Sequence, residues 1–300
     1  NRGSRRFVSG PAWQQQVWRE GGFLFDMGPS WYLMPSAFER IFGLLGTAPE
    51  REYELIRLDP SYRVYHDAGR FDVRADLEAN RTTFDALEPD GFRKTLKYLA
   101  RAKEQYDIST SKFLYRDYER LADLLTPAVI LPGLKLGLFR SVAGLTARDF
   151  SSDLMRKLMG FTMVFIGGSP DRTPGFYALM SHIDLNLNVR YPMGGMQVPA
   201  LALEKLGRAS GARFLFDTPV RKIVAEGGRV RAVRTDGGDI EADLVVANAD
   251  YVHVERDLLE PGQRSYADRS WERKTVAPSG FVLYLGLSKR LPQLLHHNLY

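Results

Sequence analysis

The chain has 300 residues, 44% of them hydrophobic and 26% charged, which is the balance of a soluble globular protein with room for one large domain or two ordinary ones. It has no cysteine, which excludes disulfides and cysteine-ligated metal centres, and none of its five histidines has a metal-ligand spacing. The net charge of +5 is spread thinly and indicates general solubility, with attraction to anionic membranes or phosphates as the alternative. No nucleic-acid-binding motif is present, so no such partner is expected.

The first 75 residues are predicted to hold short strands and one helix. A strand over 22–26 comes first. Ser36 and Glu39 then have the spacing of a capping box that opens a helix over 37–45, and Gly46 would end it. Further strands are expected at 55–58, 62–66 and 71–74, the last two joined by a turn.

Residues 76–190 are predicted to be mostly helical. The clearest helix covers 90–106, where Phe92, Leu96 and Leu99 lie near one face. The apolar stretch Leu121–Phe139 contains too many prolines, glycines and charges to span a membrane, and we expect it either to lie in a membrane interface or to be buried in a helical subdomain. Other helices are expected at 76–87, 115–125, 147–159 and 175–184.

The remainder of the chain changes to a helix followed by short strands. A helix is predicted over 197–209, and Ser210-Gly211 would close it. Turn signals separate the strands that follow, so a β-meander is expected. The predicted strands are 214–216, 220–225, 230–235, 240–241 and 244–247, and strand signals return at 280–287.

The most informative segment is Phe25–Pro35, in which a short apolar strand meets a Gly-Pro turn and two adjacent aromatic residues. Glycine permits a close backbone approach and proline stiffens the turn. Trp31 and Tyr32 add flat surfaces, so the segment suits the wall of a planar ligand. The chain has no G-x-S-x-G elbow, P-loop or G-x-G-x-x-G, and without a further clue it indicates only a mixed α/β protein.

The same segment resembles the FDxGPSWYLM segment of the phytoene desaturase family, the bacterial and archaeal FAD-dependent carotenoid desaturases with an amine-oxidase-like fold. The similarity continues in order and spacing at 167–170, 191–196, 218–220 with 223, 236–237, 242–250, 283–287 and 296–297. In that family a G-x-G-x-x-G strand comes first and a glycine-rich segment lies at the far C-terminus. The resemblance therefore implies that this chain is an internal portion lacking both, and that residues 1–16 are atypical.

The resemblance implies an α/β (α+β) flavoprotein fold with an incomplete FAD-binding domain and a helical, membrane-associated substrate domain. Residues 1–75 would form part of the FAD-binding domain and the start of the substrate domain. Residues 76–190 would form the mainly helical domain, 191–250 the second part of the FAD-binding domain, and 251–300 the start of a second substrate-domain segment.

The resemblance also assigns residues to the cofactor FAD and to the substrate. Gly28, Pro29 and Ser30 would lie beside the flavin, with Trp31 and Tyr32 near the substrate channel; a packed strand–helix turn is the alternative. Further contacts with FAD are implied for Met193, Gly194 and Gly195 at the flavin, for the backbone of Val220 at the adenine, and for the backbone of Asn248 and Ala249. The alternatives are a helix-leading loop and an ordinary meander strand.

Two residues are candidates for catalysis. Asp153 and Arg156 lie one helical turn apart in a region that the family places near its active site. The carboxylate would take a proton or stabilise a cation. The alternative is a surface ion pair between residues three apart.

The activity implied is that of an FAD-dependent carotenoid desaturase, which oxidises phytoene or a related C30–C40 polyene by hydride transfer to flavin N5. Its expected partners are the polyene, a membrane surface contacted peripherally from the cytoplasm, and oxygen or a quinone as electron acceptor, without a metal. The alternatives are a carotenoid ketolase or isomerase, a truncated or degenerate non-catalytic fragment, and a flavoenzyme acting on polar amines.

Overall fold

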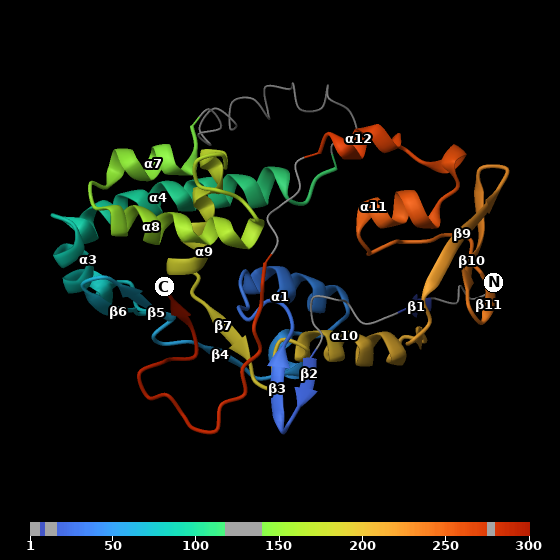
Figure 1. Ribbon diagram of the computed structural model, residues 1–300, viewed down its shortest axis with the longest axis horizontal. Helices are drawn as coiled ribbons and strands as arrows, with labels where there is room; N and C mark the ends of the chain where they lie inside the picture. Colours follow the sequence, from blue (N-terminus) through green and yellow to red (C-terminus); the bar gives the residue numbers. More distant parts are fainter. Residues whose placement is uncertain (1–6, 10–16, 118–139, 275–279) are drawn as a thin grey trace. The chain divides into compact units, whose positions relative to one another are not determined.

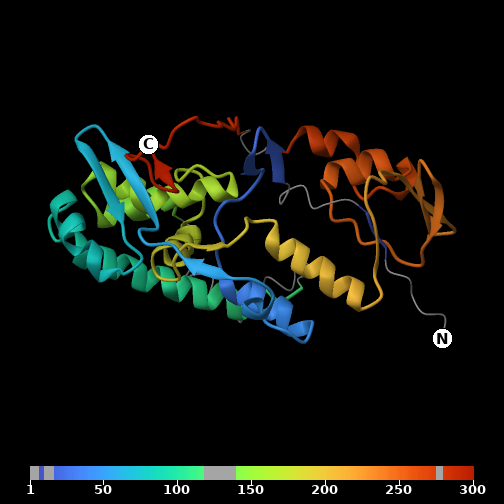
Figure 2. The same ribbon diagram turned by 90° about the horizontal axis from the view of Figure 1, so that it is seen from below.

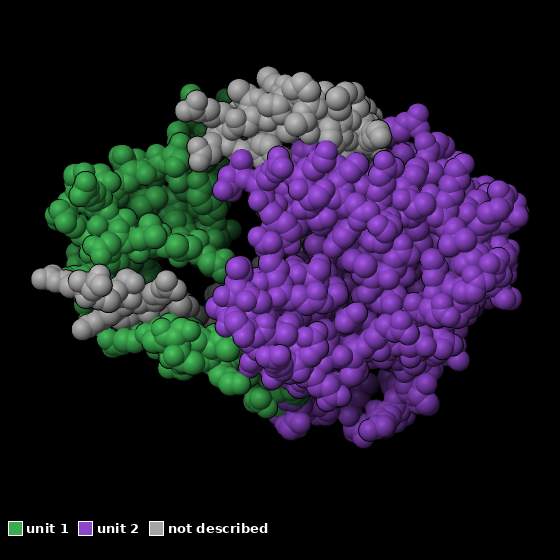
Figure 3. Space-filling view, turned by 180° about the vertical axis from the view of Figure 1, so that it is seen from behind, with its two compact units in different colours: residues 1–20, 24–28, 197–276 green, residues 21–23, 29–196, 277–300 purple. Residues whose placement is uncertain are grey.

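The structure, a computed structural model, describes residues 7–9, 17–117, 140–274 and 280–300. The chain divides into two compact units, which Figure 3 shows in separate colours. Unit 1 comprises residues 1–20, 24–28 and 197–276, and unit 2 comprises residues 21–23, 29–196 and 277–300. The domain limits expected from the sequence stay predictions. The chain passes from one unit to the other at residues 20/21, 23/24, 28/29, 196/197 and 276/277.

Unit 2 is mainly helical. Figure 1 shows its long helix α4 beside α9, and α7 beside α8, and these are pairs of helices in direct contact. Its helices are α1 (Pro35–Leu44), α2 (Pro49–Glu52), α3 (Arg81–Leu87), α4 (Gly91–Ile108), α7 (Val142–Asp149), α8 (Asp153–Gly160) and α9 (Leu179–Leu185). Short 3₁₀ or π turns are η2 (Glu78–Asn80), η3 (Ser109–Phe113), η4 (Phe161–Ile166) and η5 (Gly175–Ala178).

Two small sheets complete unit 2. Strands β5 (Tyr62–His66) and β6 (Gly69–Val73) form an antiparallel hairpin, and β12 (Asn298–Leu299) pairs in parallel with β5. Figure 2 shows this hairpin with the C-terminal end of the chain next to it. Strand β4 (Leu55–Arg57) pairs antiparallel with β7 (Arg190–Pro192).

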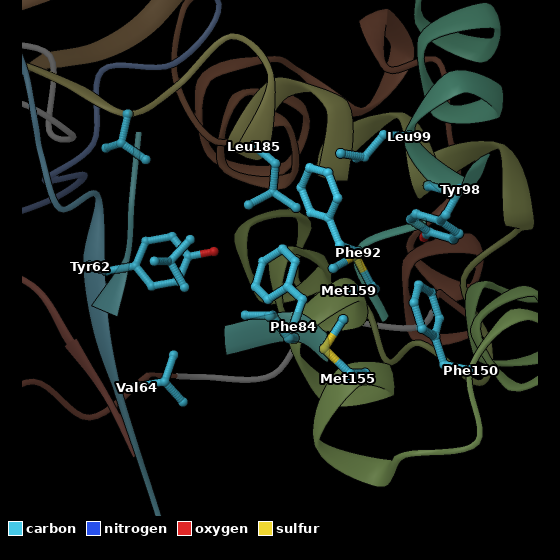
Figure 4. Packing of buried hydrophobic residues seen from close by; sticks show 14 of the residues in the cluster. Tyr62, Val64, Phe84, Phe92, Tyr98, Leu99, Phe150, Met155, Met159 and Leu185 are labelled. Atoms are coloured by element: carbon cyan, nitrogen blue, oxygen red, sulfur yellow. The ribbon is translucent and has the colours of Figure 1, made fainter. Parts of the chain in front are cut away.

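The core of unit 2 lies between the helices and the β5–β6 hairpin. Alternation along β5 turns Tyr62 and Val64 inward, as expected for a strand with one buried face. They meet apolar side chains from α3, α4 and α8, among them Phe84, Phe92 and Met159 (Figure 4). This packing buries Tyr62 completely.

Unit 1 contains one longer helix and a meander of strands. Helix α10 (Val198–Ala209) ends at Ser210 and Gly211, as the sequence predicts. Strands β9 (Val220–Glu226), β10 (Arg229–Thr235) and β11 (Gly238–Glu241) form an antiparallel sheet in the order β11-β10-β9. The other elements are β1 (Phe7–Ser9), paired in parallel with β8 (Arg213–Leu215), the turns η6 (Val254–Leu258) and η7 (Pro261–Gln263), and helices α11 (Tyr251–His253) and α12 (Asp268–Glu272). Strands β2 (Val17–Glu20) and β3 (Phe23–Asp26) pair with each other.

The expected helices are largely confirmed, with three corrections. Helix α1 starts at Pro35 behind Met34, without a side-chain cap, so the capping box predicted at Ser36 and Glu39 is wrong; proline at the first helical position starts the helix earlier. The helix expected over 147–159 is split into α7 and α8, because Ser152 caps a new helix. Residues 115–117 are not helical, and the rest of the helix predicted over 115–125 lies outside the described residues.

Two predicted strands do not form. Residues 244–247 and 280–287 are in neither helix nor strand. Strand residues need a partner to satisfy their backbone groups, and in the described part of the chain none pairs with these segments. Several of their apolar side chains, Val246 and Phe281 among them, are exposed.

Across the described residues, no helix has both the length and the apolar character needed to cross a membrane. The stretch Leu121–Phe139, predicted to contact a membrane or to be buried, lies outside the described residues.

Candidate functional site

Trp31 is the centre of an aromatic cluster in unit 2. Its indole stacks on Tyr62 with 5.2 Å between ring centroids and 21° between planes. Phe161 and Phe165 of η4 approach it at 5.9 and 5.1 Å, and His297 meets it edge-on at 5.6 Å. We call these five residues the aromatic cluster. Because Trp31 is half-buried and Phe165 is 47% exposed, the cluster joins the core to the surface.

A buried carboxyl group lies beneath the cluster. The hydroxyl of Tyr62 donates a hydrogen bond to Oδ2 of Asp184 at 2.7 Å, and both residues are buried. Burial raises the pKa of Asp184 to about 7, against the hydrogen bond from Tyr62, which lowers it. Oδ1 of Asp184 has no hydrogen-bond partner among the described residues. The carboxyl group is therefore close to half-protonated near neutral pH.

His297, a member of the cluster, contacts two polar residues, Ser30 and His296. Nε2 of His297 lies 3.2 Å from Oγ of Ser30, and Nδ1 of His297 lies 2.9 Å from Nδ1 of His296. Burial lowers the pKa of His297 to about 4, so its ring is neutral at pH 7. Ser30, a predicted flavin neighbour, is thus held by a neutral imidazole next to Trp31.

Tyr32 has a different environment from Trp31, although both are predicted to line the substrate channel. Tyr32 is only 1% exposed, stacks on Phe38 at 4.0 Å and shares a hydrogen bond of 2.8 Å with the hydroxyl of Tyr53. Its backbone bonds to that of Arg190 in both directions, at 2.9 and 3.2 Å. Of the two aromatic residues, Trp31 is the more exposed.

Three of the predicted flavin residues of unit 2 lie in the turn after β7, where Met193 and Gly194 are exposed and Gly195 is buried. The amide of Met193 donates to the carbonyl of Glu54 at 2.9 Å, which holds the start of the turn. Gly194 and Gly195 have φ of 95° and 100°, a conformation that favours glycine and leaves the backbone without side chains. Pro29 is likewise exposed.

The predicted flavin residues of unit 1 are Gly28, Val220, Asn248 and Ala249. Val220 starts β9 and packs against the small core around Ile223, Val254 and Leu258. Gly28, Asn248 and Ala249 are exposed.

Asp153 and Arg156 have separate partners. Asp153 is at the start of α8, is exposed, and forms an ion pair with Lys157 at 2.8 Å. Nε of Arg156 donates to the carbonyl of Phe150 at 2.7 Å. The ion pair considered between Asp153 and Arg156 is therefore replaced by one between Asp153 and Lys157.

Tyr62 and Asp184 were not among the candidates from the sequence. The available signal is Asp184 itself, a carboxylate between Ile183 and Leu185 in a short helix whose other residues are largely buried. Charged residues are rarely buried without a partner, so this one is notable once its burial is known. The sequence alone does not identify the partner, because Tyr62 is 122 residues away.

The chain as a whole corresponds to a known class of protein. Residues 16–295 match the family of flavin-containing amine oxidoreductases, and the chain belongs to this family. The predicted amine-oxidase-like α/β fold is therefore confirmed, and so, at the level of the family, is a flavin cofactor.

Within that family the chain is similar to carotenoid desaturases, which confirms the resemblance to the phytoene desaturases. It is 39% identical over 282 residues to a carotenoid 3,4-desaturase of Haloarcula japonica, covering 93% of this chain and 57% of that protein. It is 35% identical over 294 residues to a zeta-carotene-forming phytoene desaturase of Myxococcus xanthus, covering 97% and 56%. The chain thus spans about half the length of the curated relatives it matches.

A solved structure supports the fold alone. A Pyrococcus furiosus protein is 13% identical, with a TM-score of 0.51, and the match covers 89% of this chain and 57% of that one.

Proposed function

We propose that the protein is an FAD-dependent carotenoid desaturase that oxidises a phytoene-like C30–C40 polyene at a CH–CH bond. The observation that carries this proposal is the similarity to a carotenoid 3,4-desaturase along 93% of the chain. The half-exposed aromatic cluster around Trp31 supports it, because an extended apolar ligand requires an apolar and aromatic surface.

The chain's own residues fit a flavin in chemistry. Gly194 and Gly195 offer adjacent backbone without side chains, and the conformation of both favours glycine. Ser30 offers a hydroxyl beside the neutral ring of His297. We propose that these residues, with Gly28, Pro29 and Met193, hold the flavin, and that Val220, Asn248 and Ala249 contact FAD through their backbone. When bound, FAD supplies the hydride acceptor, flavin N5.

The residues of the chain then have to bind and align the polyene and exclude water. Trp31 and Phe165 offer aromatic faces against which a conjugated chain can pack. The neutral His297 keeps charge away from this surface. The ring of Tyr32 is buried, so this residue would support the site as part of the core and would not contact the polyene.

Three finer assignments belong to the same proposal. Asp153 and Arg156 are candidates for moving the proton, although the exposure of Asp153 and its pairing with Lys157 favour a surface role. A peripheral contact with the cytoplasmic membrane surface follows from the solubility of the polyene in lipid. Oxygen or a quinone would reoxidise the flavin.

The test is flavin uptake followed by substrate reduction. Purified protein is incubated with FAD, freed of unbound FAD, and mixed with phytoene in vesicles without oxygen. We expect a yellow protein whose flavin absorbance bleaches as desaturated product appears. The variant Gly194→Val would lose FAD, because a β-branched residue disfavours a positive φ.

Two results would count against the proposal. A colourless protein that takes up no FAD would favour the non-catalytic alternative. Bleaching by a polar amine, but not by phytoene, would favour an amine-oxidising flavoenzyme. Product analysis by mass distinguishes a desaturase from a ketolase, which adds oxygen, and from an isomerase, whose product keeps its mass.

A further inference from the structure

Trp31, which is partly exposed, stacks on the fully buried ring of Tyr62. Its indole lies nearly parallel to the ring of Tyr62, whereas Phe161, Phe165 and His297 meet it edge-on or tilted. Tyr62 is thus the neighbour that covers a face of the indole, in the stacked geometry that aromatic pairs favour. The orientation of the indole therefore depends on Tyr62.

Tyr62 is in turn held by Asp184. The ring of Tyr62 is packed on its edge by Phe161 at 5.3 Å, and its hydroxyl reaches Oδ2 of Asp184 at 2.7 Å. Asp184 is 2% exposed and its second oxygen has no partner among the described residues. A buried carboxyl group with an unsatisfied oxygen is costly. Packing alone would hold a phenylalanine at position 62, which needs no buried carboxyl partner. The free-energy cost of burying Asp184 therefore indicates a role beyond filling the core.

We propose that Tyr62 and Asp184 are positioning residues that hold the indole of Trp31 in the plane at which an isoprenoid polyene binds. This inference rests on the proposed function for the class of ligand. Phe165 extends the same surface, because it lies 5.1 Å from Trp31 and is almost half exposed. The hydrogen bond between Tyr62 and Asp184 limits the tilt of both stacked rings, and a flat ligand then meets a surface whose shape is already set.

The test follows Trp31 and polyene binding directly, without turnover. Replacing Trp13, Trp18 and Trp271 with phenylalanine leaves Trp31 as the one tryptophan of the chain. All-trans-retinol in detergent serves as the probe, because its absorption overlaps tryptophan emission and quenches it. In this background we expect Tyr62→Phe to shift the emission of Trp31 to longer wavelength and to weaken retinol affinity about ten-fold, the effect of about one hydrogen bond.

A matched control and a conservative variant separate positioning from stability. Tyr98 is also buried in the core of unit 2 and its hydroxyl lies 3.5 Å from that of Ser181, so Tyr98→Phe removes a comparable group away from Trp31. We expect this control to leave the emission of Trp31 and retinol affinity unchanged. Asp184→Asn keeps an oxygen that accepts from Tyr62 and should retain most of the affinity, whereas Asp184→Leu should lose it as Tyr62→Phe does.

Two outcomes overturn the inference. One is a Tyr62→Phe protein that folds and matches the Tyr98→Phe control in emission and affinity. The other is a parent protein whose Trp31 emission does not respond to retinol at all. Failure of the proposed function would give a different result. A chain that takes up no FAD and desaturates no polyene would refute the desaturase. If its retinol binding still depended on Tyr62 and Asp184, the positioning role would stand.

Discussion

The carboxyl group of Asp184 makes the stability of the protein depend on pH. Its pKa is raised by burial from 3.8 to about 7, so the native state binds this proton more tightly than the unfolded state. The resulting stabilisation is fully present below pH 3.8 and is lost as the pH rises through 7. We expect Asp184→Asn to remove this loss. The free energy of unfolding of the variant, measured with urea, should then rise relative to that of the parent by about 3 kcal/mol between pH 5 and pH 8.

The control for this prediction is Asp171→Asn, which changes an exposed carboxylate in the same unit. It should follow the parent protein at every pH. If the difference between Asp184→Asn and the parent stayed constant from pH 5 to 8, the carboxyl group would not titrate in this range and the prediction would be wrong.

At the scale of residues, the sequence showed which kinds of side chain are present better than it showed which of them are buried. The aromatic pair Trp31 and Tyr32 is evident in the sequence, yet only packing against Phe38 and Tyr53 reveals that Tyr32 belongs to the core. Asp184 could not be found in the same way, because a carboxylate in a short helix is ordinary until its surroundings are known. Exposure is a property of tertiary contacts, and residues far apart in the chain provide them.

At the scale of elements, Glu88 links the end of α3 to the start of α8. Its oxygens accept hydrogen bonds from Oγ of Ser151 at 2.7 Å and from the amide of Ser152 at 2.5 Å, and the ammonium group of Lys94 completes the set. Burial alone would raise the pKa of Glu88, but these hydrogen bonds outweigh it and lower the pKa to about 2. The link therefore depends on an ionised carboxylate.

We expect Glu88→Gln to destabilise the protein by about 2 kcal/mol at pH 7, because the amide keeps one acceptor oxygen and loses the charge. The pKa of Glu88 is depressed in the folded state, so the contribution is present above pH 4.5 and disappears as the pH falls through about 2. Urea midpoints at pH 7 and 3 should show a smaller difference at the lower pH. Glu78→Gln, which alters an exposed pair with Arg81, should change neither midpoint appreciably.

The same link explains which elements the sequence predicted incorrectly. Most helices and the β5–β6 hairpin follow from local periodicity and turn residues, which depend only on neighbours in the chain. The break between α7 and α8 has a local signal in the capping residue Ser152, which was missed in the sequence, whereas the bonds from Ser151 and Ser152 to Glu88, more than sixty residues earlier, have none. The segments 244–247 and 280–287 have strand composition, but a strand forms only where a second strand accepts its backbone groups.

At the scale of the molecule, these two segments give each unit an exposed apolar edge. In unit 1, Val246 is 85% exposed, and in unit 2, Phe281 is 88% exposed, with Leu283 and Leu285 close by. Exposed apolar segments tend to associate with other chains. We therefore expect the chain to self-associate as its concentration rises and to bind the dye ANS.

Adding one charge to such an edge should reduce this association. We expect Val246→Lys or Leu283→Lys to lower the apparent mass in sedimentation over a dilution series and to reduce ANS fluorescence, because a desolvated lysine opposes strand pairing. Gln293→Lys adds the same charge at an exposed polar position and should leave both measurements near those of the parent. Equal effects from all three substitutions would mean that net charge, rather than the apolar edges, controls association.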